Sequence, residues 1–119
     1  CYVVLGMKKP APFPPPIELM LLALVARRPA HGYAVIERLR ADSAGHFDLP
    51  EGTVYPALYR LERLGLLASE AQQVAGRTRR IYRTTAAGRA ALRKRRGAWR
   101  RLIESVGAVL DEPPVAGHA

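Results

Sequence analysis

The chain has 119 residues, 49% of them hydrophobic, which suffices for one small domain with a modest buried core. Its 19 lysines and arginines against 10 acidic residues give a formal net charge of +9, which favours nucleic acid or an anionic membrane surface as the partner. A single cysteine excludes a disulfide framework and a cysteine-rich zinc site, and no apolar run is long enough for a membrane span, so we expect a basic cytoplasmic protein.

The first 16 residues are expected to form a proline-rich arm, because residues 8–16 read KKPAPFPPP and favour an extended, solvated segment. A strongly apolar helix is predicted from Ile17 to Arg28, where Pro29 ends it. A second, amphipathic helix is predicted within HGYAVIERLRA, residues 31–41, with His31 capping or packing at its start. Residues 42–50 are predicted to form a turn.

A third helix is predicted from about Glu51 to Leu64, because Gly65 suits the left-handed position that follows a helix. Five of its apolar residues recur at helical spacing and are expected to face the core. They are Val54, Ala57, Leu58, Leu61 and Leu64.

The opposite side of this helix carries hydroxyl and guanidinium groups, which donate hydrogen bonds to phosphate oxygens and base edges. An ordinary solvated face is an equally good interpretation of this helix taken alone. The outward residues are Thr53, Tyr55, Pro56, Tyr59, Arg60 and Arg63.

Two short strands are predicted next, at residues 66–74 and 77–85, joined by a turn at Ala75 and Gly76. Ile81 is expected to point inward, whereas Arg77, Arg79, Arg80 and Arg83 give the second strand a strong positive charge. Between Glu70 and Glu104 the sequence has no acidic residue. Since a surface that serves only solubility intersperses both signs of charge, this stretch favours phosphate binding.

A long helix is predicted from Thr85, a suitable N-cap, to about Leu110, with a tail at residues 111–119. Its apolar residues follow the heptad spacing of helices that pack against another helix. The packing partner could be the first helix of the same chain or the same helix of a second copy. We favour an arrangement in which the long helix packs on both. The expected interface residues are Leu92, Trp99, Leu102, Ile103, Val106, Val109 and Leu110.

Three motifs together resemble the PadR-type transcriptional regulators, which are winged helix-turn-helix proteins that dimerise through a C-terminal helix. The motifs are LLALVARRPAHGYAVIERL, PEGTVYPALYRLERLGLL and GRTRRIYRTTAAGRAAL, within residues 17–92. The resemblance implies a mainly α fold with a small β-hairpin. It divides the chain into a winged helix-turn-helix DNA-binding domain at residues 17–84 and a dimerisation helix at residues 85–110, as in the smaller members of the family.

The resemblance also implies that the helix at residues 51–64 enters the major groove of DNA, with the hairpin as a wing over adjacent phosphates or the minor groove. Tyr33, in the HGY motif, matches a position suited to a contact with the DNA backbone, and a half-buried core tyrosine is the alternative. The other positions that match the family's DNA-facing residues are Thr53, Tyr55, Pro56, Tyr59 and Arg60 on the helix, and Arg77, Thr78, Arg79 and Arg80 on the wing.

The implied function is that of a sequence-specific DNA-binding regulator, a repressor that acts as a homodimer on an inverted repeat. The resemblance further implies release of DNA by a small hydrophobic or aromatic effector. Trp99 offers a flat surface on which such an effector could stack, and an ordinary core aromatic is the alternative. No metal or other cofactor is expected.

Other classes of function fit the sequence less well. A winged-helix module that binds a protein or RNA is the runner-up. An enzyme is disfavoured because His31, His46 and His118 lack the spacing of metal ligands and no glycine-rich phosphate loop follows a strand. A membrane-surface role is disfavoured because the arginines of the last helix leave no broad apolar face in its first half.

Overall fold

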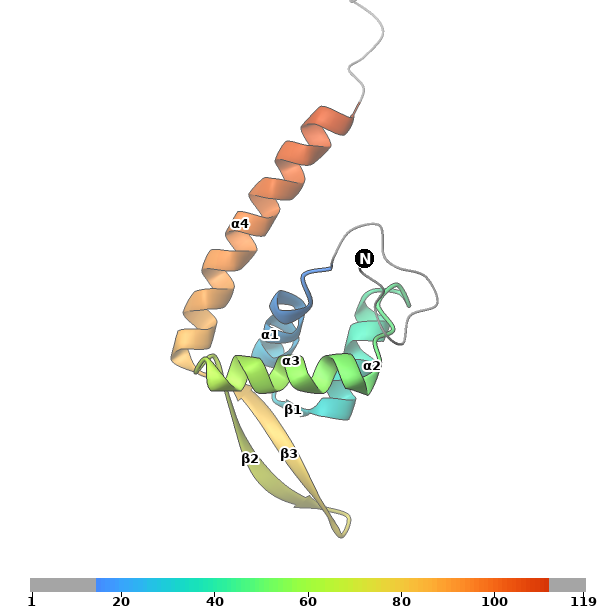
Figure 1. Cartoon of the computed structure of the whole chain (residues 1–119), viewed down its shortest axis with the longest axis vertical. Coiled ribbons are helices and arrows are strands. Elements are labelled where there is room, and N and C mark those ends of the chain that lie inside the picture. Colours follow the sequence, from blue (N-terminus) through green and yellow to red (C-terminus); the bar gives the residue numbers. More distant parts are fainter. Residues whose placement is uncertain (1–14, 112–119) are drawn as a thin grey trace, which may run out of the picture.

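The computed structural model describes residues 15–111, which form four helices and a three-stranded antiparallel sheet (Figure 1). This confirms the predicted mainly α fold with its β-hairpin. Residues 1–14 of the predicted arm (residues 1–16) and residues 112–119 of the predicted tail (residues 111–119) lie outside the described residues. The elements in chain order are α1 (Ile17–Arg27), β1 (Ala30–His31), α2 (Gly32–Asp42), α3 (Glu51–Arg63), β2 (Leu67–Val74), β3 (Arg77–Thr84) and α4 (Ala86–Leu110).

The core lies between the first three helices and the base of the sheet. α3 faces it with an apolar stripe at helical spacing, as predicted, and Val54, Ala57, Leu58 and Leu61 are fully buried. The main contributions from the other two helices are Leu21, Leu22, Leu24 and Val25 on α1, and Val35, Ile36 and Leu39 on α2.

The end of α3 corrects one predicted core residue. Leu64 is 63% exposed. The chain turns sharply after it, because Gly65 takes the left-handed conformation at φ 80° and donates a 2.9 Å hydrogen bond from its N–H to the Glu62 carbonyl. The Leu66 N–H then donates to the Leu61 carbonyl at 3.0 Å. This turn directs Leu66 into the core in place of Leu64.

The predicted hairpin is formed by β2 and β3, which pair antiparallel from Leu67 opposite Thr84 to Val74 opposite Arg77. Its turn has positive φ at both Ala75 and Gly76, 51° and 76°, as in the type I′ turns whose twist matches that of paired strands.

The two-residue strand β1 was not predicted. It pairs with β3, so the strand order is β1-β3-β2, and His31 lies opposite Ile81. Two residues are too few for any period in hydrophobicity to reveal them. Their pairing fixes the start of α2 against the hairpin.

Tyr82, rather than Ile81, is the inward residue of β3, so the predicted orientation was wrong by one position. Tyr82 is only 8% exposed, and its cross-strand neighbours are the small residues Ala30 and Ser69. Ile81 shares the other face of the strand with His31. Burial, followed by the nearby charge of Glu62, raises the pKa of the Tyr82 phenol.

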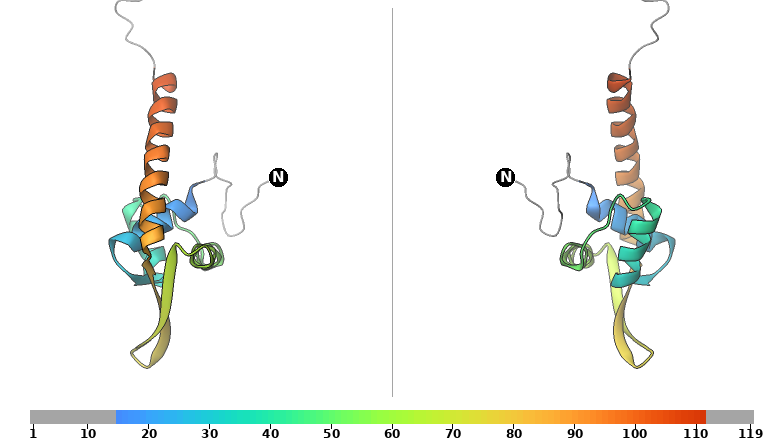
Figure 2. Two further views of the ribbon diagram at one scale, coloured as in Figure 1. Left: turned by 90° about the vertical axis from the view of Figure 1, so that its left-hand side faces the viewer. Right: turned by 90° about the vertical axis from the view of Figure 1, so that its right-hand side faces the viewer.

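α4 starts at the predicted N-cap, where the Thr85 hydroxyl accepts a 3.0 Å hydrogen bond from the Gly88 N–H. The first part of its 25 residues packs on α1, and the remainder projects from the helical body at the end opposite the hairpin (Figure 1; Figure 2). Among residues 15–111, no helix combines the length and the apolar character needed to cross a membrane.

Candidate nucleic-acid interface

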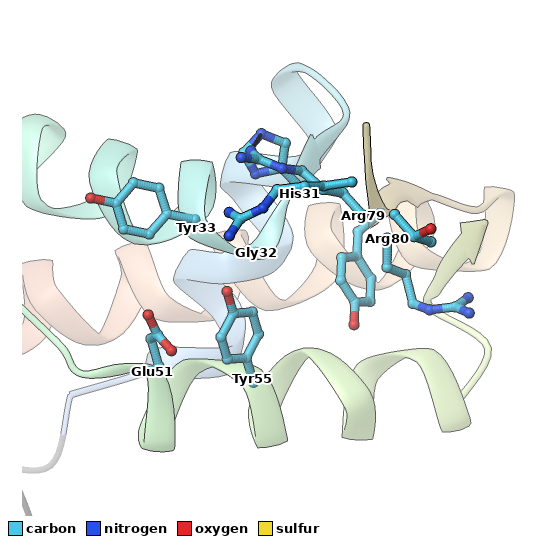
Figure 3. A pocket seen from close by; sticks show the side chains of 10 residues that line it. His31, Gly32, Tyr33, Glu51, Tyr55, Arg79 and Arg80 are labelled. Atoms are coloured by element: carbon cyan, nitrogen blue, oxygen red, sulfur yellow. Dashed lines mark hydrogen bonds between the residues drawn. The ribbon is translucent and has the colours of Figure 1, made fainter. Parts of the chain in front are cut away.

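A cleft of about 590 Å³ lies where the hairpin, the β1–α2 corner and the start of α3 meet (Figure 3). We call it the wing cleft. It brings Tyr33, Tyr55 and the four predicted wing residues together from three separate segments of the chain. Its lining consists of His31, Gly32, Tyr33, Glu51, Tyr55, Arg77, Thr78, Arg79, Arg80 and Tyr82.

The hairpin side of the wing cleft is positively charged. Of its three arginines, Arg79 and Arg80 donate only to neutral groups, and none of the three is ion-paired to a carboxylate within residues 15–111. Arg83, further along β3, differs because it is ion-paired with Glu70 at 2.9 Å. Guanidinium groups without an acidic partner can bind a phosphate without first giving up an ion pair.

His31 connects the wing to α2. Its Nδ1 lies 3.4 Å from the Ala34 N–H that it caps, which confirms the predicted capping role, and its Nε2 lies 3.1 Å from Nη1 of Arg79. A neutral imidazole has only one acceptor nitrogen, so it cannot accept both hydrogen bonds at once. With its proton on Nδ1 the ring accepts from Arg79, and with its proton on Nε2 it accepts from the Ala34 N–H.

Gly32 and Tyr55 are in direct contact across α2 and α3. A Cβ atom placed on Gly32 would lie 2.0 Å from Cε1 of Tyr55, so the ring occupies the space that any other residue would need. Tyr55 is still 38% exposed, and burial together with the charge of Glu51 raises the pKa of its phenol. Gly32 is a site residue that the sequence analysis missed, because nothing in its local pattern reveals a ring from another helix.

Tyr33 points away from the core, being 54% exposed, and this excludes the alternative of a half-buried core tyrosine. A hydrogen bond to Glu37, and the charge of that carboxylate, raise the pKa of the Tyr33 phenol. The close-up view shows Tyr33 on α2, at the edge of the cleft that the wing arginines also line (Figure 3).

The outer face of α3 carries the remaining predicted residues. Tyr59 is 58% exposed, and the guanidinium carbon of Arg63 lies 5.8 Å from the centre of its ring. Pro56 is exposed and Thr53 is half-buried. Arg60 is also exposed, but its Nε donates a 2.6 Å hydrogen bond to Oε2 of Glu18 on α1.

The apolar residues of α4 are divided by position. Leu92 is 6% exposed and belongs to the core of this chain, so it takes part in the expected contact with the first helix of the same chain. The other six predicted interface residues, which begin at Trp99, are between 36% and 83% exposed. These exposed residues, named here the α4 stripe, are Trp99, Leu102, Ile103, Val106, Val109 and Leu110.

Trp99 also borders a second, mostly apolar cavity of about 330 Å³ between α1 and α4. Its other lining residues are Pro16, Leu19, Met20, Ala23, Phe47, Leu92, Arg96 and Arg100. Within the part of the chain that the structure describes, no three histidine, cysteine or acidic side chains gather closely enough to hold a metal ion.

Comparison with known proteins identifies the family. Residues 21–94 match the profile described as the Transcriptional regulator PadR-like family. A transcriptional regulator of Mycobacterium tuberculosis is 42% identical over 90 residues, which cover 76% of this chain and 81% of that protein. A PadR family transcriptional regulator from Eggerthella lenta has a solved structure that matches with a TM-score of 0.71 at 36% identity, covering 82% of this chain and 83% of the other. A PadR family regulator from Clostridium difficile matches with a TM-score of 0.70 at 26% identity, covering 80% and 98%. The chain therefore belongs to the PadR-like family of transcriptional regulators.

Proposed function

We propose that this regulator is a homodimer that binds an inverted repeat in duplex DNA, with residues 17–84 as the DNA-binding domain and residues 85–110 as the dimerisation helix. The observation that carries the proposal is the wing cleft, in which three wing arginines, none of them ion-paired within residues 15–111, lie beside the exposed phenol of Tyr55 on α3. A winged-helix module for a protein or RNA remains the second candidate.

In this proposal α3 reads the bases. Tyr59 is the most exposed aromatic residue of its outer face and would contact base edges, while Thr53 and Pro56 lie close to the helix start that approaches the groove. Arg60 has to exchange its ion pair with Glu18 for a contact with DNA. Tyr55, held against Gly32, would present its phenol at the edge of the wing cleft. Each good base contact is worth about 1–3 kcal/mol of discrimination.

The wing and Tyr33 would hold the phosphate backbone. Arg77, Arg79 and Arg80 supply the positive charge, and Thr78 adds a hydroxyl donor near the tip of the hairpin. Such contacts fix the orientation of the protein on the duplex and supply much of the affinity, but they do not distinguish one sequence from another. They also make the affinity fall with rising salt.

The α4 stripe is the proposed dimer interface. Six apolar residues, exposed on a helix that projects from the body, offer a surface that a second copy of the same helix can cover. A two-fold dimer places its two recognition helices about 34 Å apart, which is one turn of DNA, and this requires an inverted repeat as operator. An operator that overlaps a promoter would exclude polymerase, so we infer repression.

A small hydrophobic or aromatic effector would bind in the apolar cavity beside Trp99. The cavity lies between α1 and α4 and adjoins the α4 stripe, so a molecule in it can favour one arrangement of the two copies over another. Release of DNA requires the effector to bind more tightly to the arrangement in which the recognition helices no longer match the operator.

The test is selection of bound duplexes from a random library, followed by affinity measurements at two salt concentrations. We expect an inverted repeat to be enriched. Tyr59→Ala should lose the preference for it by about 1–3 kcal/mol, whereas Arg79→Ala should weaken all duplexes alike and lower the salt slope by about one unit. If no sequence is enriched, the DNA-reading role of α3 is wrong and a protein or RNA partner becomes the leading candidate.

A further inference from the structure

The side-chain hydroxyl of Thr85 bridges the end of α3 and the start of α4. Oγ1 of Thr85 donates a 2.6 Å hydrogen bond to the Gly65 carbonyl, just beyond α3, and accepts a 3.0 Å hydrogen bond from the Gly88 N–H in the first turn of α4. The Thr85 N–H in addition donates to the Leu66 carbonyl at 3.2 Å. One residue therefore satisfies polar groups of both helix ends.

Gly88 brings the two helix ends into direct contact. A Cβ atom at this buried glycine would lie 2.0 Å from the Leu66 carbonyl oxygen and 2.8 Å from Cγ2 of Thr84. The first turn of α4 thus rests on the backbone that leaves α3, with no side chain between them. We call Gly65, Leu66, Thr85 and Gly88 the α3–α4 joint.

The joint has little freedom on the side of α3. Gly65 and Leu66 are held by their hydrogen bonds to Glu62 and Leu61 in the last turn of that helix. A tilt of α4 relative to α3 therefore has to break or stretch the contacts of Thr85, since the chain on the α3 side is already fixed.

We propose that the α3–α4 joint, through the Thr85 hydroxyl, sets the angle between recognition helix and dimerisation helix and thereby the half-site spacing that the dimer accepts. The inference rests on the proposed homodimer. It makes Thr85 a positioning residue that determines specificity without touching DNA.

The geometry gives this angle a large effect on the operator. α3 has 13 residues and is about 20 Å long, so a rotation of about 10° about its joint end moves its far end by about 3.5 Å. That displacement is about one base-pair step along DNA. A small change at the joint is therefore enough to shift the preferred spacing by one base pair.

Three substitutions separate this role from helix capping. Thr85→Ser keeps a hydroxyl that both donates and accepts. Thr85→Asp keeps a good N-cap acceptor for Gly88 but has no donor for the Gly65 carbonyl. Gly88→Ala forces a methyl group toward the Leu66 carbonyl oxygen. Gly97→Ala is the matched control on α4, since its Cβ would meet only Nη1 of Arg101, at 3.5 Å.

The experiment measures affinities of the full chain for duplexes that carry the selected half-sites at the native spacing and at spacings one and two base pairs shorter or longer. The mass of the protein in solution, its helix content by circular dichroism and its affinity for a single half-site are measured in parallel. We expect wild type, Thr85→Ser and Gly97→Ala to share one sharp optimum.

Thr85→Asp and Gly88→Ala should bind the duplex of native spacing with about tenfold lower affinity, and their optimal spacing should move by one base pair or disappear. Both variants should keep the mass of the dimer, and their affinity for a single half-site should stay within about twofold of wild type. A wild-type spacing profile in either folded variant, or an equal loss at every spacing, would overturn the inference. A wild type without any preferred spacing would instead contradict the proposed homodimer, so the two failures are distinguishable.

Discussion

The imidazole of His31 lies 3.1 Å from the guanidinium of Arg79, so the N-cap of α2 and the wing share a polar contact. The same residue is the N-cap of α2, with Nδ1 3.4 Å from the Ala34 N–H. The contact also orients Arg79 in the cleft where the proposed phosphate would bind.

His31→Asn should weaken binding to all duplexes alike by about fivefold, the equivalent of one hydrogen bond of about 1 kcal/mol. Asparagine is a good N-cap, so α2 keeps its cap, but its shorter side chain does not extend to Arg79. Fluorescence anisotropy with random-sequence and operator duplexes measures the loss. In an Arg79→Ala background the same substitution should not lower the affinity further. If the affinity there falls by the full fivefold again, the two residues act independently.

Gly32→Ala should lower the free energy of unfolding by about 1–3 kcal/mol, because the new methyl group and the Tyr55 ring cannot occupy the same space. Urea unfolding measures the change. Gly52→Ala is the matched control, since a Cβ on Gly52, in the first turn of α3, would have no atom within 4 Å. Replacing Tyr55 by alanine as well should recover most of the lost free energy of unfolding. If it does not, the strain lies in the backbone of α2.

Glu18→Gln should release Arg60 from α1 at little cost in stability, below about 1 kcal/mol, since the ion pair is exposed to solvent. If Arg60 has to leave Glu18 in order to contact DNA, the variant should bind the operator more tightly, by up to about fivefold. Parallel urea unfolding and operator titrations separate the two effects. Unchanged operator affinity would place Arg60 outside the DNA contacts.

Ile103→Glu should convert the protein to a monomer while leaving the free energy of unfolding of each chain nearly unchanged, because Ile103 is already half exposed. A charge at this position of the α4 stripe would be buried without a partner in a dimer, which costs several kcal/mol. Sedimentation velocity gives the mass. Arg101→Glu introduces the same side chain on the opposite side of the helix and should remain dimeric. A dimeric Ile103→Glu protein would exclude the α4 stripe as the interface.

The helices could be predicted from the sequence because each carries its own local signals. The apolar stripe of α3, the glycine that ends it and the Thr85 cap of α4 are all visible in short stretches of sequence, and the structure confirms them. The arginines of the wing could be recognised because one sign of charge dominates the whole segment.

Contacts between distant residues could not be predicted in this way. β1 is too short for a hydrophobic pattern, and its pairing with β3 places Tyr82, rather than Ile81, opposite the buried Ala30. The ion pair of Arg60 with Glu18 joins residues 42 positions apart, and no spacing rule connects them. The packing of Tyr55 on Gly32 likewise depends on how two helices cross.

The pairing of β1 with β3 also has a consequence for synthesis of the protein. His31 and Arg79 are 48 positions apart in the sequence, yet they lie on neighbouring segments of the wing cleft. A nascent chain that has reached only the end of α3 already contains the proposed recognition helix but has neither wing nor cleft. The proposed DNA contacts of the wing can therefore form only late in translation, after β3 has left the ribosome.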